Sequence, residues 1–272
     1  MRGLIITADD FGMAPEVNEA VEIACTRGVL SAASLMVGAP ATADAVRRAR
    51  GLPGLRVGLH LVLTDGRPVL PPERIPHLVR SDGAFHDNMA VAGATLFFHP
   101  AARRELAAEI TAQFEAFTAT GLNLDHVNAH KHFHLHPTIL DLTLAIGDGF
   151  GMKAMRVPSD PHAGMSLTGA FARLVRMRAT RAGMLTPDRV FGLAWSGAMS
   201  SERLEKVIAT LPSGLSEIYL HPATAGDFAG ADAAYRYEDE LTALISPAVA
   251  NAVREAGAKL GGFGDFAPPG SV

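Results

Sequence analysis

Short apolar runs and helix-like segments alternate along this chain, and this alternation limits the folds open to it. Residues 3–8 have the continuous apolar character of a strand buried on both faces, and residues 15–28 have helical periodicity that ends at a glycine. Strand and helix alternate about seven or eight times, with no internal repeat and no linker. This pattern predicts a single α/β domain over residues 1–272 with a parallel sheet. Further strands are expected near residues 31–37, 55–61, 126–136, 153–158, 190–193, 216–222 and 259–263, and further helices near 41–49, 103–118, 137–146, 201–210 and 247–256.

The amino-acid composition is typical of a globular domain with a hydrophobic core. Hydrophobic residues make up 48% and charged residues 19% of the 272 positions, which is ample for a sizeable core. A net charge of -4 gives no reason to expect nucleic acid as the main partner. The single cysteine, Cys25, excludes an internal disulfide framework and a cysteine-rich zinc site. No leader-like N-terminus or run of about 20 apolar residues occurs, so we expect a soluble, cytoplasmic protein.

Side chains that bind metals or transfer protons stand where several predicted strands end. Because the carboxyl ends of parallel strands meet on one face, which is the catalytic face of (β/α) barrels, they indicate an active site. Local alternatives exist, since paired aspartates also occur in turns and helix caps, and a lone histidine at a strand end is commonly structural. The residues concerned are Asp9, Asp10, His60, His130, Arg156 and His221.

Residues 126–137 hold five of the 11 histidines of the chain. If this segment is extended, its four later histidines, from His130 to His136, share one side over about 20 Å, at roughly 3.3 Å per residue. Metal–nitrogen bonds are only about 2 Å long. At most one or two of these histidines can therefore bind a single metal, and the other ligands must come from elsewhere in the chain.

One aspartate and two histidines form an unsaturated ligand set, which leaves a position for water as a catalytic metal site requires. A second aspartate can act as general base toward that water, and a histidine from a distant strand end can act as general acid. An arginine near a carboxylate lowers its pKa and fixes its orientation. The residues therefore predict a metal-dependent hydrolase.

Four separate motifs resemble those of the YdjC-like carbohydrate deacetylases, relatives of chito-oligosaccharide deacetylase. They lie at residues 8–12 (ADDFG), 58–68 (GLHLVLTDGRP), 130–134 (HKHFH) and 220–222 (LHP), and thus extend from the first predicted strand to one of the last. The resemblance implies a fold like that of the polysaccharide deacetylases, a distorted (β/α) barrel that binds one divalent metal. It also implies hydrolysis of an N-acetyl group on a glucosamine-type sugar.

The resemblance also implies a role for each residue that matches a motif. This chain departs at Asn128 from a member of the family that has aspartate there, so no carboxylate role is assigned to this residue and only a supporting hydrogen bond is predicted. His132, His134 and Arg67 are candidates for substrate binding or for support of the site. The implied roles are metal ligand for Asp10, His60 and His130, base for Asp9, orientation of the base for Arg156, and acid for His221.

Residues 52–60 and 126–137 look most like the branch of this family associated with hopanoid biosynthesis. That branch implies an N-acetylglucosaminyl-hopane intermediate as substrate, and chito-oligosaccharides are the alternative with the same mechanism. A basic amphipathic segment, residues 165–185, is compatible with peripheral contact at the inner membrane surface. An ordinary helix with a solvated basic face explains this segment equally well, and ordinary packing equally explains the apolar run 96–98.

Histidine ligation favours zinc, with cobalt or nickel as alternatives, while the family is often described with magnesium. Two other functions compete with a deacetylase. Another metallohydrolase, acting on phosphate esters or cyclic amides, would call for additional arginines or glycine-rich loops near the strand ends. A non-catalytic carbohydrate- or metal-binding barrel would not need both a base and an acid. The oligomeric state is left open.

Overall fold

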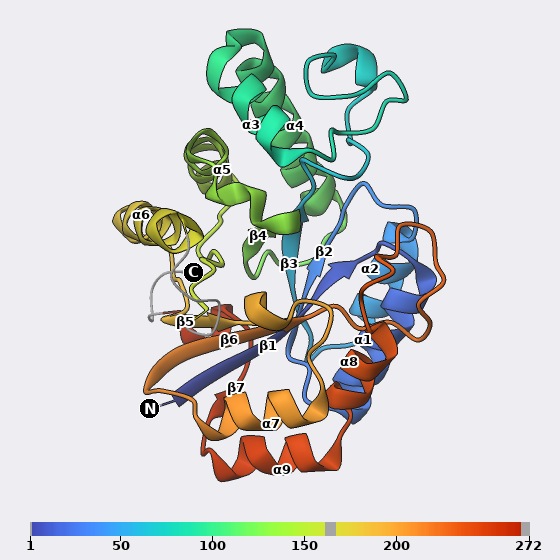
Figure 1. Ribbon diagram of the computed structural model, residues 1–272, viewed down its shortest axis with the longest axis vertical. Helices are drawn as coiled ribbons and strands as arrows, with labels where there is room; N and C mark the ends of the chain where they lie inside the picture. The colour runs from blue at the N-terminus through green and yellow to red at the C-terminus, as the bar shows by residue number, and fades with distance from the viewer. Residues whose placement is uncertain (1, 161–166, 268–272) are drawn as a thin grey trace.

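The computed structural model describes residues 2–160 and 167–267, and a parallel sheet is the centre of the fold (Figure 1). The paired strands of these residues are β1 (Arg2–Phe11), β2 (Ala32–Leu35), β3 (Arg56–Leu61), β4 (Val127–Ala129), β5 (Arg189–Phe191), β6 (Gly214–Leu220) and β7 (Lys259–Leu260). Their order is β4-β3-β2-β1-β6-β5, and β7 pairs with β1. All of these pairings are parallel, which confirms the α/β prediction.

The first strand lies at the middle of this sheet. Every residue of β1 after Arg2 is buried, as its apolar sequence predicts for a strand covered on both faces. Its longest ladder joins it to β6, from Arg2 to Ala8, while β7 and β2 share its other edge. The register against β2 shifts between Ala8 and Phe11, where Asp9 and Asp10 stand.

The sheet curls into a half-barrel. The segment expected as a strand at residues 153–158 does not form a full ladder. Two isolated parallel bridges, Val127 with Met155 and Ala154 with Leu185, extend pairing beyond the β4 edge. The predicted barrel is therefore present as a curled half-barrel sheet, which two single bridges extend beyond its β4 edge.

Helices cover the outside of the curled sheet (Figure 1). Four of the predicted helices begin with proline, whose fixed φ suits the first helical turn. Two further helices, α3 and α8, were not predicted. The helices are α1 (Pro15–Arg27), α2 (Thr42–Arg50), α3 (Met89–Phe98), α4 (Pro100–Ala119), α5 (Pro137–Gly149), α6 (Leu167–Arg181), α7 (Ser201–Ala209), α8 (Tyr237–Leu244) and α9 (Pro247–Glu255).

Two segments bear on the predicted membrane contact. In α6, Val175 and Ala179 are buried in the core, and Arg178 forms an ion pair with Asp141 of α5; residues 165 and 166 lie outside the described residues. In α3, Leu96 is buried, but Phe97 and Phe98 are 56% and 79% exposed. Ordinary packing in the core therefore explains these apolar residues of α6. It does not explain the two exposed phenylalanines at the end of α3. Across residues 2–160 and 167–267, no helix has both the length and the apolar character needed to cross a membrane.

Candidate active site

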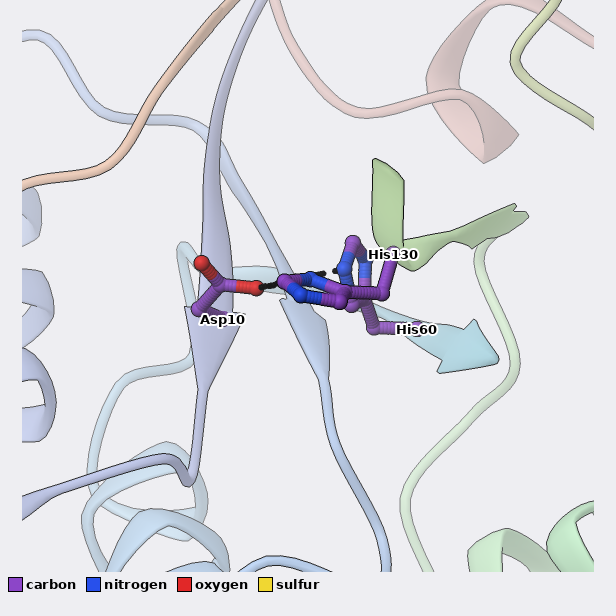
Figure 2. Close-up of side chains that lie close together, drawn as sticks. All are labelled: Asp10, His60 and His130. Atoms are coloured by element: carbon purple, nitrogen blue, oxygen red, sulfur yellow. Dashed lines mark hydrogen bonds and ion pairs between the residues drawn. The ribbon is translucent and has the colours of Figure 1, made fainter. Parts of the chain in front are cut away.

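Asp10, His60 and His130 converge from three different strands (Figure 2). Asp10 lies near the carboxyl end of β1, His60 lies in β3, and His130 directly follows β4. Asp10 Oδ1 is 3.2 Å from His60 Nε2 and 3.2 Å from His130 Nδ1. One ligand atom from each of the three residues lies within 4.8 Å of the others, as a shared metal ion requires.

The surroundings of these three side chains fit a divalent metal. His60 Nε2 is buried and makes no well-formed hydrogen bond to any residue the structure describes, so its lone pair is available to a ligand. Burial raises the pKa of the Asp10 carboxyl, but the adjacent His130 and His60 rings outweigh this effect and hold the pKa well below its usual range. Two nitrogens and one carboxylate oxygen form a donor set suited to zinc and its neighbours, with positions left for water and substrate.

Asn128 supports the site from β4. His60 Nδ1 lies 2.7 Å from Asn128 Oδ1, and donation from this nitrogen leaves the lone pair of Nε2 free to bind a metal. The Asn128 amide nitrogen donates to Asp9 Oδ1 at 3.1 Å and to Ser34 Oγ at 3.2 Å. An ionised aspartate here could accept from His60 but could not donate to Asp9. The amide of Asn128 thus supports both His60 and Asp9, which an ionised aspartate could not do.

Removal of this amide tests its role. Asn128→Ala is expected to weaken metal binding by about 10- to 100-fold, because His60 loses the partner that fixes its tautomer and orientation. Competition with a chromogenic chelator measures the affinity. Asn251→Ala, a change at an exposed residue of α9, is the matched control and should leave the affinity unchanged. Equal metal affinity in both variants would contradict the role assigned to Asn128.

Asp9 is held by a fully buried arginine. Arg156 Nη1 donates to Asp9 Oδ2 at 2.5 Å, and Nη2 donates to Asp9 Oδ1 at 3.0 Å. On the other side, Arg156 Nε donates to Glu217 Oε1 at 2.9 Å, and Thr7 Oγ1 donates to the same oxygen at 2.8 Å. Burial raises the pKa of the Asp9 carboxyl, but the charge and hydrogen bonds of Arg156, together with the nearby His60 and His221, outweigh this effect, so the pKa lies well below its ordinary value. Asp9 is therefore ionised and fixed in orientation.

Three residues of this network were not identified from the sequence: Ser34, Glu217 and Tyr219. Ser34 Oγ donates to Asp9 Oδ1 at 2.6 Å. The Tyr219 ring lies 4.5 Å from the guanidinium carbon of Arg156. Glu217 and Tyr219 belong to β6, and a charged residue in the middle of a buried strand was a signal available in the sequence.

A cavity of about 310 Å³ joins the three candidate ligands to the proposed acid. The His221 ring is 5.7 Å from the Tyr219 ring and 5.0 Å from the Tyr235 ring, and the His221 backbone N–H donates to Glu240 Oε2 at 2.5 Å. The residues predicted from sequence that line this cavity are Asp9, Asp10, His60, His130, His132 and His221.

The expectation of an extended histidine segment is wrong beyond Ala129. Residues His130–Leu135 form 3-10 turns interrupted by a kink, at which Lys131 and His132 have left-handed φ angles of 51° and 55°. The chain turns there, so the later histidines do not share one side. His132 Nε2 lies 2.9 Å from the Tyr219 hydroxyl, whereas His134 is buried and its Nε2 lies 3.0 Å from the carbonyl oxygen of Arg156. His134 supports the arginine segment and does not line the cavity.

Arg67, a second candidate for substrate binding, is not brought to the cavity. Its side chain is exposed and donates to the Asp82 carbonyl oxygen at 3.4 Å. The loop that carries it is fixed by the buried Glu109 of α4, which accepts hydrogen bonds from the backbone of Val69 at 2.8 Å and Leu70 at 3.0 Å. From this loop it is Asp65 that lines the cavity.

A curled parallel sheet with an Asp-His-His cluster at the carboxyl ends of its strands defines an α/β protein with a candidate metal centre. The model of the YdjC-like protein family matches residues 3–255, and the chain belongs to this family. It is 29% identical over 270 residues to a carbohydrate deacetylase of Geobacillus stearothermophilus, covering 97% of this chain and 98% of the relative. It is 32% identical over 268 residues to a chitooligosaccharide deacetylase of Enterobacter sp. strain 638, with the same coverage.

The fold also matches a solved structure over nearly its whole length. A protein from Enterococcus faecalis V583, provisionally named a cellobiose-phosphate cleavage protein, superposes with a TM-score of 0.81 at 27% identity. The superposition covers 98% of this chain and 99% of the other.

Proposed function

We propose that this protein is a metal-dependent deacetylase that removes the N-acetyl group from an N-acetylglucosamine-type sugar. The observation that carries the proposal is a single cavity lined by the Asp10-His60-His130 cluster, by Asp9 and by His221. The names of two relatives that match along almost the entire chain, a carbohydrate deacetylase and a chitooligosaccharide deacetylase, support the same reaction.

A divalent metal held by Asp10, His60 and His130 would lower the pKa of water and polarise the acetyl carbonyl. Asp9 takes the proton from the attacking water. Its Oδ1 accepts hydrogen bonds from Ser34, Asn128 and Arg156, whereas Oδ2 accepts from Arg156 alone among the described residues, so Oδ2 has the free capacity.

Arg156 fixes the carboxylate plane of Asp9 through two hydrogen bonds, which aims Oδ2 without any rearrangement. His221 gives a proton to the leaving nitrogen as the carbon–nitrogen bond breaks. The water oxygen thereby becomes part of acetate, and the sugar retains a free amine. The Glu240 carboxylate fixes the backbone of His221, so this ring projects from a rigid strand end.

We further propose zinc as the metal, since two of the three ligand atoms are histidine nitrogens. For the substrate, we propose the N-acetylglucosaminyl-hopane intermediate. The resemblance of residues 52–60 and 126–137 to the hopanoid-associated branch supports it, as do the exposed phenylalanines of α3, which suit contact with a lipid. Peripheral membrane contact through residues 165–185 belongs to the same proposal. The name of the Enterobacter relative favours chito-oligosaccharides as the second candidate.

Acetate release by the purified, metal-analysed protein tests both candidates. N-acetylglucosaminyl-hopane and diacetylchitobiose are incubated in parallel, and acetate is measured enzymatically. Release from the lipid only would support the hopanoid substrate. Release from chitobiose only would keep the mechanism and discard the lipid, and release from neither by the metal-loaded protein would contradict the deacetylase proposal.

A further inference from the structure

Backbone strain is concentrated at the cavity. Among the described residues, four that are not glycine have positive φ: Asp10 at 61°, Asp65 at 49°, Lys131 at 51° and His132 at 55°. All four line the same cavity. The left-handed region is unfavourable for a lysine, which has no short polar side chain to bond its own backbone. Such strained residues persist where the surrounding structure holds them, and they gather at functional sites.

Three of these four residues have no place in the mechanism described above, and two of the three, Asp65 and Lys131, contact each other. Asp65 belongs to the loop after β3, and Lys131 belongs to the turn after β4. Their side chains form an ion pair across the cavity rim, although they are 48% and 44% exposed. Exposed ion pairs add little to stability. The pair therefore does not explain why the chain retains two strained backbones.

We propose that Lys131 and Asp65 together determine substrate specificity by binding adjacent hydroxyl groups of the sugar that is deacetylated. This inference rests on the proposed function. The ammonium group donates and the carboxylate accepts, so side chains close enough to pair with each other match two neighbouring hydroxyls on one pyranose ring. When a neutral sugar separates the two side chains, the hydroxyl groups replace their contact with each other, and the opposite charges of Lys131 and Asp65 still cancel at the cavity rim.

The position of the pair agrees with this role. Lys131 follows the candidate ligand His130 directly, so its backbone strain sets the direction of its side chain relative to the metal site. The cavity volume of about 310 Å³ is at the low end for ligand sites, and suits one sugar ring. A ring whose acetyl group lies at the Asp10-His60-His130 cluster brings its other substituents to the rim.

Substitution with residues that accept a left-handed backbone separates strain from side-chain function. Lys131→Gly and Lys131→Asn are expected to keep or slightly raise the melting temperature, because both residues tolerate positive φ. The same variants should raise KM by about 10-fold with kcat within about three-fold of wild type, as expected for loss of a hydrogen bond from a charged group. Asp65→Asn should also raise KM by about 10-fold and change kcat by less than about three-fold. Lys206→Ala, which removes an exposed ion pair with Glu202 on α7, is the control and should leave KM unchanged.

Deoxygenated substrates distinguish sugar binding from a merely structural link between two loops. Diacetylchitobiose and its analogues that lack one hydroxyl on the deacetylated ring are compared with the wild-type and Lys131→Gly proteins. The wild type should lose about 10-fold in kcat/KM with one of the analogues, and the variant should lose almost nothing further with that analogue. Equal losses in the two proteins, or an unchanged KM in the variants, would overturn the inference and leave the proposed function intact.

If the wild type releases no acetate from these sugars or from N-acetylglucosaminyl-hopane, the proposed function fails separately. Calorimetric titration of the same proteins with N-acetylglucosamine then tests the rim pair. A weaker Kd in Lys131→Gly and Asp65→Asn, with Lys206→Ala unchanged, would support sugar binding by the pair. Equal Kd values in all four proteins, or no measurable binding by the wild type, would overturn it.

Discussion

His60→Ala is expected to lose the bound metal and, with it, the acetate-releasing activity. The side chain is buried in β3, its Nε2 faces the Asp10 carboxylate, and its Nδ1 is occupied by Asn128. Alanine removes one of the three proposed ligands, and no other described histidine, cysteine or carboxylate completes this cluster. Loss of a ligand should exceed the 10- to 100-fold effect of losing an outer partner, so metal affinity should fall by more than about 100-fold. Metal analysis after dialysis and acetate release after metal addition measure the two effects.

His221→Ala is the matched histidine variant. It should keep one metal per chain and lower kcat by about 10²- to 10⁴-fold, because it removes the proposed proton donor for the leaving amine and none of the proposed ligands. Stoichiometric metal in His60→Ala would refute the ligand role of His60. Full activity in His221→Ala would remove His221 from the mechanism.

Arg156→Met should be the most destabilising of these substitutions. Arg156 is fully buried and stands between two buried carboxylates, Asp9 and Glu217. Methionine fills much of the volume but leaves both carboxylates without their cation. Removal of one partner of a buried ion pair costs about 3–5 kcal/mol in the free energy of unfolding. For a domain of this size, the melting temperature should fall by roughly 10 °C, as calorimetry would show.

The surface arginine of α6 provides the comparison. Arg178 is 37% exposed and pairs with Asp141, and Arg178→Met should cost at most about 1 kcal/mol. Arg156→Lys should remain well below wild type in stability, since an ammonium group cannot reproduce the planar hydrogen bonds to both carboxylates. Similar melting temperatures for the Arg156 and Arg178 methionine variants would contradict the role of the buried network.

Local sequence patterns predicted most of the sheet, because the apolar residues of a strand are those that the fold buries. The apolar run at residues 3–8 and the alternation that follows it give β1, α1 and β2 close to their observed bounds. The end of β1 was placed too early, at Ala8. The strand continues through Asp9 and Asp10 because Arg156 and two histidines, all distant in sequence, compensate the buried carboxylates. No pattern within the strand itself records those partners.

The histidine segment shows a second limit. Its regular alternation favours an extended strand, yet the chain turns at His130 through two left-handed residues. Neither Lys131 nor His132 is a glycine or an asparagine, the residues that favour a left-handed turn. The conformation therefore comes from the surrounding structure and not from local preference. The distance of Arg67 from the cavity has a related reason, since a motif gives the position of a residue in the sequence but not the course of the long loop that carries it. Asp10, His60 and His130 do lie together, because strand ends share one edge of a parallel sheet, and their role as metal ligands stays a prediction.

The topology also sets the order in which the molecule can be assembled during synthesis. All three candidate ligands are present once residue 130 has left the ribosome, but the longest ladder of β1 is with β6, at residues 214–220. Until β6 is made, the strand that carries both aspartates has an unpaired edge. The negative charge of Asp9 has no buried cation beside it until Arg156 is made, and Glu217, which holds Arg156 from the other side, follows later still. Contacts this distant in sequence form slowly and expose unpaired strands meanwhile. The nascent chain therefore contains its candidate ligands well before it contains β6, the strand that completes the centre of the sheet.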